Sequence, residues 1–170
     1  APLSPQDLQR AFEAALPDHP FDPGLIALAE GSVGQAAELS LTEGVKTYGA
    51  IVDMCRTLPR FDRVKLLKLA NSVGRGTDEK FDQILNLLDI FIERLARVAV
   101  SPTGAYEASG GEKEVLLRLC PDQNDSRLWA DTQLELSQRA RQGKTANLDP
   151  SSLILDMGLR IEETASKILR

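Results

Sequence analysis

The chain has 170 residues, of which 42% are hydrophobic and 26% charged, and its formal net charge at pH 7 is −5. This composition is typical of a globular protein with one or two domains and excludes the disordered and fibrous classes. Because no run approaches the roughly 18 apolar residues of a membrane helix and the N-terminus lacks a signal-peptide pattern, we expect a soluble protein of the cytoplasm without a membrane partner.

Helix-start signals recur three times within the first 42 residues. Ser4 is followed by a proline and an acidic residue ahead of an apolar series, which predicts a helix over 5–16. Asp22 and the proline after it give a second start, and Ser32, three residues before a glutamine, gives a third. We therefore expect a small three-helix domain over 1–42.

Longer helices follow, and the clearest apolar stripe lies over 78–98, where large hydrophobic residues recur at three- and four-residue spacing. Gly143 is expected to end the penultimate helix and Asp149 to cap the last one. Residues 101–111, rich in glycine, serine and proline, are expected to form a mobile surface loop. The predicted helices cover 45–57, 62–73, 78–98, 112–119, 126–142 and 150–169.

No segment shows a strand-like alternation of useful length. The sequence therefore predicts an all-α protein, in which the three-helix domain over 1–42 precedes a five- to six-helix bundle over 43–170. A change in composition near Thr42 and Gly44 marks the boundary between the two.

The sequence offers few candidates for catalysis or metal binding. His19 is the single histidine and stands in a predicted turn, and neither Cys55 nor Cys120 has a second ligand at metal-binding spacing. The two cysteines suit buried thiols in a reducing compartment. Gly143 opens a GKT triplet that copies the end of a phosphate-binding loop, but Gln138 stands where that motif requires glycine. We expect no cofactor, no metal and no enzymatic activity in this chain.

Two groups of charged residues are expected at the surface. Two acidic pairs have spacings that do not converge on one helix face, and both are predicted to be solvated. They are Glu112 with Glu114 and Glu162 with Glu163. The basic segment from Arg56 to Lys68 favours a charged helix surface, with a regulatory module that binds a nucleic-acid or phosphorylated ligand as the alternative. The acidic balance of the chain disfavours direct DNA binding.

One apolar residue of the long helix, Ile90, lies on the face opposite its apolar stripe. Arg94 and Arg97 share that face at helical spacing. Because the centres of protein interfaces favour apolar residues and arginine, these three residues are a candidate contact with a neighbouring subunit.

The segment LAEGSVGQAA at 28–37 resembles the glycine–serine motif in the lid domain of clamp-loader subunits. Further along the chain, several segments are similar to the collar region of the delta-prime type of bacterial clamp-loader subunit. The resemblance covers nearly the whole chain, and the order of the motifs carries it. The collar-like segments are Tyr48, LPRFDR at 58–63, the apolar helix over 78–98, ANLDP at 146–150 and LILD at 153–156.

The resemblance identifies position 34 as the one that senses the nucleotide in related subunits. ATPase members of the family carry a sensor arginine there, whereas Gly34 offers no charge to a nucleotide phosphate. The resemblance thus implies a non-catalytic assembly module, with a lid over 1–42 and a collar over 43–170. Such a module holds the motor ATPase subunits and delta together while a sliding clamp is loaded in DNA replication. It also implies that a nucleotide-hydrolase-like domain precedes Ala1, and that DNA and the clamp are contacted only through the assembled complex.

Overall fold

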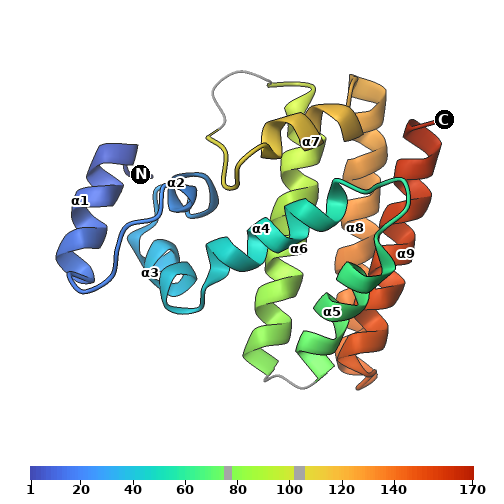
Figure 1. Ribbon diagram of the computed structural model, residues 1–170, viewed down its shortest axis with the longest axis horizontal. Helices are drawn as coiled ribbons and strands as arrows, with labels where there is room; N and C mark the ends of the chain where they lie inside the picture. Colours follow the sequence, from blue (N-terminus) through green and yellow to red (C-terminus); the bar gives the residue numbers. More distant parts are fainter. Residues whose placement is uncertain (75–77, 102–105) are drawn as a thin grey trace.

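The computed structural model describes residues 1–74, 78–101 and 106–170, and these residues form helices and no strand (Figure 1). The predicted all-α fold class is therefore confirmed. In the described part of the chain, none of the helices combines the length and the apolar character that crossing a membrane requires. In chain order the helices are α1 (Pro5–Ala15), α2 (Gly24–Leu28), α3 (Val33–Leu41), α4 (Gly44–Cys55), α5 (Arg63–Gly74), α6 (Asp78–Val98), α7 (Glu112–Leu119), α8 (Gln123–Thr145) and α9 (Pro150–Ile168).

The first three helices lie together at one end of the molecule (Figure 1). The Ser4 hydroxyl oxygen accepts the Asp7 N–H at 3.2 Å, as its predicted capping role requires. The Ser32 hydroxyl oxygen likewise accepts the Gln35 N–H at 3.3 Å. Each bond satisfies a backbone donor that a helix N-terminus leaves free. Phe12 of α1 is completely buried and belongs to the same hydrophobic core as the later helices.

The apolar side of α6 fills the centre of the remaining helices. α6 packs on α4, α7 and α8, and α9 packs on α5 and α8, so that the long helices run side by side (Figure 1). Full burial of one large apolar side chain stabilises a fold by roughly 1.5–3 kcal/mol, and this stripe is therefore the main attachment of α6. Its buried residues are Phe81, Ile84, Leu87, Leu88, Phe91, Ile92, Leu95 and Val98.

α8 is longer at both ends than the sequence predicts, covering Gln123–Thr145 instead of 126–142. Asp122 caps it, because its carboxylate accepts two backbone N–H groups of the first turn at 2.7 and 3.0 Å. Gly143 does not end the helix. It is buried within α8, where a Cβ atom would lie 2.6 Å from Leu153 Cδ2 of α9. The glycine therefore permits close packing of α8 on α9.

The segment 106–111 lies mostly at the surface, as the sequence predicts for the loop over 101–111, and Tyr106, Glu107 and Gly110 are exposed. Residues 102–105 of that loop lie outside the described residues. Ala108 is buried, and its N–H donates to Glu112 Oε2 at 2.7 Å. The segment is thus a surface loop that is anchored at Ala108, because the Glu112 carboxylate satisfies the backbone donor of that residue.

Candidate functional site

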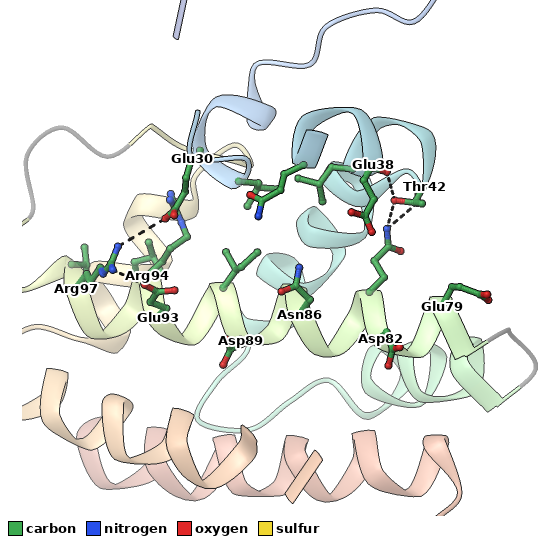
Figure 2. A pocket seen from close by; sticks show the side chains of 18 of the residues that line it. Glu30, Glu38, Thr42, Glu79, Asp82, Asn86, Asp89, Glu93, Arg94 and Arg97 are labelled. Carbon is green, nitrogen blue, oxygen red and sulfur yellow. Dashed lines mark hydrogen bonds and ion pairs between the residues drawn. The ribbon is translucent and has the colours of Figure 1, made fainter. Parts of the chain in front are cut away.

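A groove of about 880 Å³ separates α6 from the pair formed by α2 and α3 (Figure 2). α2 and α3 provide one wall, and α6 provides the other along most of its length. The three residues predicted to face a partner, Ile90, Arg94 and Arg97, all line this groove. The structure thus brings the predicted partner face of α6 to a hollow in the surface.

Side-chain contacts join the two walls at both ends of the groove (Figure 2). At one end, Arg97 Nη1 lies 3.9 Å from Glu30 Oε1, which follows α2. At the other end, the Gln83 amide nitrogen donates to the Thr42 carbonyl oxygen at 3.3 Å and also to the Thr42 hydroxyl. Because Gln83 and Arg97 are fourteen residues apart on α6, the space between the two contacts is about 21 Å long.

The middle of the groove combines apolar and polar side chains. Leu28 and Leu39 line it from the α2 and α3 wall and are buried in the core, whereas Ile90 of α6 is half-buried and keeps part of its surface open. Asn86 points toward the groove from α6, and Glu38 points toward it from α3 (Figure 2). The Glu38 carboxylate has no cationic partner among the described residues.

Acidic side chains outnumber basic ones around the groove. Two acids point away from it: Asp82 pairs with a lysine of α8, and Asp89 accepts hydrogen bonds from α8 side chains (Figure 2). At the far end, Arg97 is shared by Glu30 and by Glu93, whose Oε1 lies 2.6 Å from Arg97 Nη2. The lining acids are Glu30, Glu38, Glu79, Asp82, Asp89 and Glu93, and the lining bases are Arg94 and Arg97.

Arg94 lines the groove, but its charge is used inside the fold. Its side chain is 17% exposed, and its Nε and Nη2 atoms donate to Glu112 Oε1 and Oε2 at 2.7 and 3.1 Å. Burial acts to lower the pKa of the Arg94 guanidinium, but the hydrogen bonds and negative charge of Glu112 outweigh it and raise that pKa. Arg94 is therefore a fixed structural cation, in contrast to the predicted open contact residue.

Glu112 is completely buried, so the prediction of a solvated carboxylate is wrong. Besides Arg94, it accepts the Tyr48 hydroxyl at 2.5 Å and the Ala108 N–H at 2.7 Å. Burial first, and then the charge and hydrogen bond of Glu112, raise the pKa of the Tyr48 phenol. This one carboxylate consequently joins α4, α6 and the segment 106–111 to the start of α7.

Glu162 of α9 also departs from the predicted solvated surface, since its side chain is only 12% exposed. Its carboxylate accepts the Phe61 N–H at 2.6 Å and lies 3.0 Å from Arg63 Nη2. It thereby holds the connection between α4 and α5 against α9. Glu163, the next residue, is 63% exposed, as predicted.

Replacing Glu162 by glutamine is expected to lower the free energy of unfolding by about 1–2 kcal/mol, because the bond to the Phe61 N–H loses its charge assistance and Arg63 loses its partner. Urea denaturation followed by circular dichroism measures the change. Glu163→Gln is the matched control and should stay within about 0.5 kcal/mol of the parent chain. Equal effects of the two substitutions would contradict a structural role for Glu162.

Arg56 and Arg63 of the basic segment from Arg56 to Lys68 do not face one shared site, although Arg60 and Arg63 line a second hollow beside Glu162. Arg56 Nη2 donates to the Gly110 carbonyl oxygen at 2.6 Å, whereas Arg63 is directed to Glu162 of α9. The two arginines thus face different parts of the fold and are engaged there. The alternative function, binding of a nucleic-acid or phosphorylated ligand through this segment, gains no support from their placement.

The other residues singled out in the sequence are isolated from one another. His19 is exposed between α1 and α2, and Cys55 and Cys120 are buried free thiols. Across the described residues, no group of three or more histidine, cysteine, aspartate or glutamate side chains is arranged to hold a metal ion. Gly34 is exposed in the first turn of α3, where a Cβ atom would meet only the Ser32 hydroxyl, at 4.0 Å.

The stability of the fold is expected to fall at alkaline pH. Burial raises the pKa of the Cys55 thiol, and the Arg118 charge opposes this only in part. The unfolded chain therefore loses this proton at about pH 8.5 while the folded chain retains it, so unfolding becomes easier as the pH rises further. For this one group the free energy of unfolding should fall by up to about 1.4 kcal/mol per pH unit above that point.

Urea denaturation at neutral pH and at about pH 9.5 measures this dependence. The Cys55→Ala variant should lose less stability over the same interval than the parent chain, because the titrating thiol is gone. An identical pH dependence in the two proteins would show that the Cys55 thiol does not contribute.

Comparison of the chain with protein families, curated proteins and solved structures found no match. Its function is therefore inferred from its sequence motifs, from the residues that line the groove, from the surroundings of Gly34 and from the hydrogen bonds of the buried carboxylates.

Proposed function

We propose that the chain is a non-catalytic assembly module of the delta-prime type in a bacterial DNA polymerase clamp loader. In this function it holds the motor ATPase subunits and delta together while the sliding clamp is placed on DNA. Residues 1–42 act as the lid and residues 43–170 as the collar. DNA and the clamp are contacted only through the assembled complex.

The observation that carries the proposal is the glycine–serine motif with Gly34 at its sensor position. Ser32 caps α3, and Gly34 is the second residue of that helix. A Cβ atom at Gly34 would have open space around it, so packing does not require a glycine there. A Cβ atom is therefore tolerated there, and the absence of an arginine supports the non-hydrolysing type, because a lid without that cation offers no charge to nucleotide phosphates.

The contacts that the buried charged residues make within the fold also favour a scaffold function. Glu112, Arg94 and Glu162 each bind at least two groups of the chain, and these contacts join helices that are distant in sequence. A carboxylate held in this way is a structural acceptor whose oxygens are already engaged. Rigid helix packing of this kind suits a module that presents fixed surfaces to neighbouring subunits.

Reconstitution of the loader tests the proposal. The complete subunit should form one complex with the motor ATPase subunits and delta, as detected by size-exclusion chromatography and native mass spectrometry. Removal of residues 43–170 should abolish that complex. Normal assembly of the shortened subunit would contradict the collar role, and failure of the complete subunit to bind either partner would contradict the proposed function as a whole.

A further inference from the structure

The groove between α6 and the α2–α3 pair retains recognition groups that the fold itself does not use. The contacts at its two ends account for Gln83 and Arg97. Between them, the open part of Ile90 and the carboxylate of Glu38 have no comparable partner within the described residues. An apolar contact and a free negative charge thus line the same hollow, and together they define what can bind there.

The shape of the groove favours a helix that lies across its mouth. The residues of α6 that line the groove run from Glu79 to Val98, about 29 Å of helix. A volume of about 880 Å³ spread over that length leaves a mean cross-section of roughly 30 Å², which is less than half that of an α-helix with its side chains. The groove therefore has room for one row of side chains from a helix, while the helix backbone stays outside. Helix-in-groove recognition works in this way, through side chains at three- and four-residue spacing.

The charged residues of the groove determine which side chains of a docked helix are complementary to it. Arg94 is neutralised by Glu112, and Arg97 faces two carboxylates, Glu30 and Glu93. With Glu38 on the other side of Ile90, both flanks of the apolar contact carry excess negative charge. A complementary occupant has an apolar residue in the middle and cations on both flanks.

We infer that the groove docks an amphipathic helix of a partner subunit that carries lysine or arginine on both sides of an apolar residue. The two cations are about 10 Å apart, or two helical turns, which matches the separation along α6 between Asn86, at the Glu38 flank, and Glu93. For the identity of the partner, the inference rests on the proposed function. The chemistry of the docked helix follows from the groove alone.

A peptide probe tests the docking chemistry. The probe is a helical peptide of about 15 residues made of leucine and lysine with one apolar face, and its counterpart has glutamate in place of lysine. Titration of the ¹⁵N-labelled chain should move the amide signals of Glu38, Asn86 and Ile90 with the lysine peptide only. Binding should weaken as salt is added, because exposed charges are screened.

Two charge-reversal variants separate docking from general attraction to an acidic chain. Glu38→Lys should weaken binding of the lysine peptide by about tenfold. Glu163→Lys changes the net charge by the same amount at an exposed site on α9 and should leave binding unchanged. Equal losses in both variants, signal changes outside the groove, or no binding would each overturn the inference. So would groove signals that move with concentration of the chain alone, since they would identify a second copy as the occupant.

Reconstitution of the loader with the same two variants distinguishes this inference from the proposed function. Weaker assembly with Glu38→Lys but not with Glu163→Lys supports both. Normal assembly with Glu38→Lys overturns the docking inference and leaves the proposed function standing. Peptide binding in the groove by a subunit that does not assemble with the loader overturns the proposed function and leaves the docking chemistry standing.

Discussion

Replacing Glu112 by glutamine is expected to lower the free energy of unfolding by about 3 kcal/mol, at the lower end of the range for removing one member of a buried ion pair. The amide keeps the size of the carboxylate but leaves the mostly buried Arg94 cation without its counter-charge. The amide nitrogen also faces donors, because the Tyr48 hydroxyl and the Ala108 N–H both donate to this side chain. Urea denaturation followed by circular dichroism measures the loss.

Glu114→Gln is the matched control, because Glu114 lies in the same helix and is exposed. Its effect should stay within about 0.5 kcal/mol. The combined Glu112→Gln and Arg94→Met variant should lose less stability than the sum of the two single variants, since both substitutions remove the same interaction. A loss below about 1 kcal/mol for Glu112→Gln would show that the buried network contributes little.

Truncation of Trp129 to alanine is expected to cost about 3–5 kcal/mol. Trp129 of α8 is completely buried, and its indole N–H donates to the Leu119 carbonyl oxygen at 2.8 Å, where α7 ends. Alanine would leave a cavity in place of the ring system and would remove the hydrogen bond that ties α8 to α7. The measurement is again the free energy of unfolding in urea, followed by circular dichroism because the only tryptophan is lost.

Two further variants separate the contributions of Trp129. Trp129→Phe keeps most of the apolar volume and loses the indole donor, so we expect an intermediate cost of about 1–3 kcal/mol. Leu134→Ala, at a position of the same helix that is 65% exposed, should cost no more than about 0.5 kcal/mol. If Trp129→Ala were no more destabilising than Leu134→Ala, the packing of α8 on α7 would not be important for stability.

The helix ends that carry local signals are those that the sequence predicts best. α6 and α7 begin and end at the predicted residues, because the apolar spacing and the flanking glycines lie within the helices themselves or next to them. α8 departs from its prediction because Gly143 has two possible uses, as a helix stop and as a site of close packing. Leu153 of α9 decides between them, and that contact is invisible in a local pattern.

The sequence likewise predicts one part of the candidate site and misses the rest. Helical periodicity is sufficient to place Ile90 and Arg97 on one face of α6, and both line the groove. The opposite wall comes from α2 and α3, which no local pattern relates to α6. Glu112 is missed for a similar reason, since Tyr48 is 64 residues away and Arg94 is 18 residues away. Burial of a charged residue is set by partners that meet only when the helices pack.

α6 is engaged on two sides along its length. Its apolar stripe enters the core, while a second set of its residues lines the groove, and Val98 belongs to both sets. Successive residues of an α-helix are about 100° apart around its axis, so one inserted residue near the middle of α6 would turn half of both faces away from their neighbours. Differences in chain length among proteins of this architecture should therefore fall between helices and spare α6.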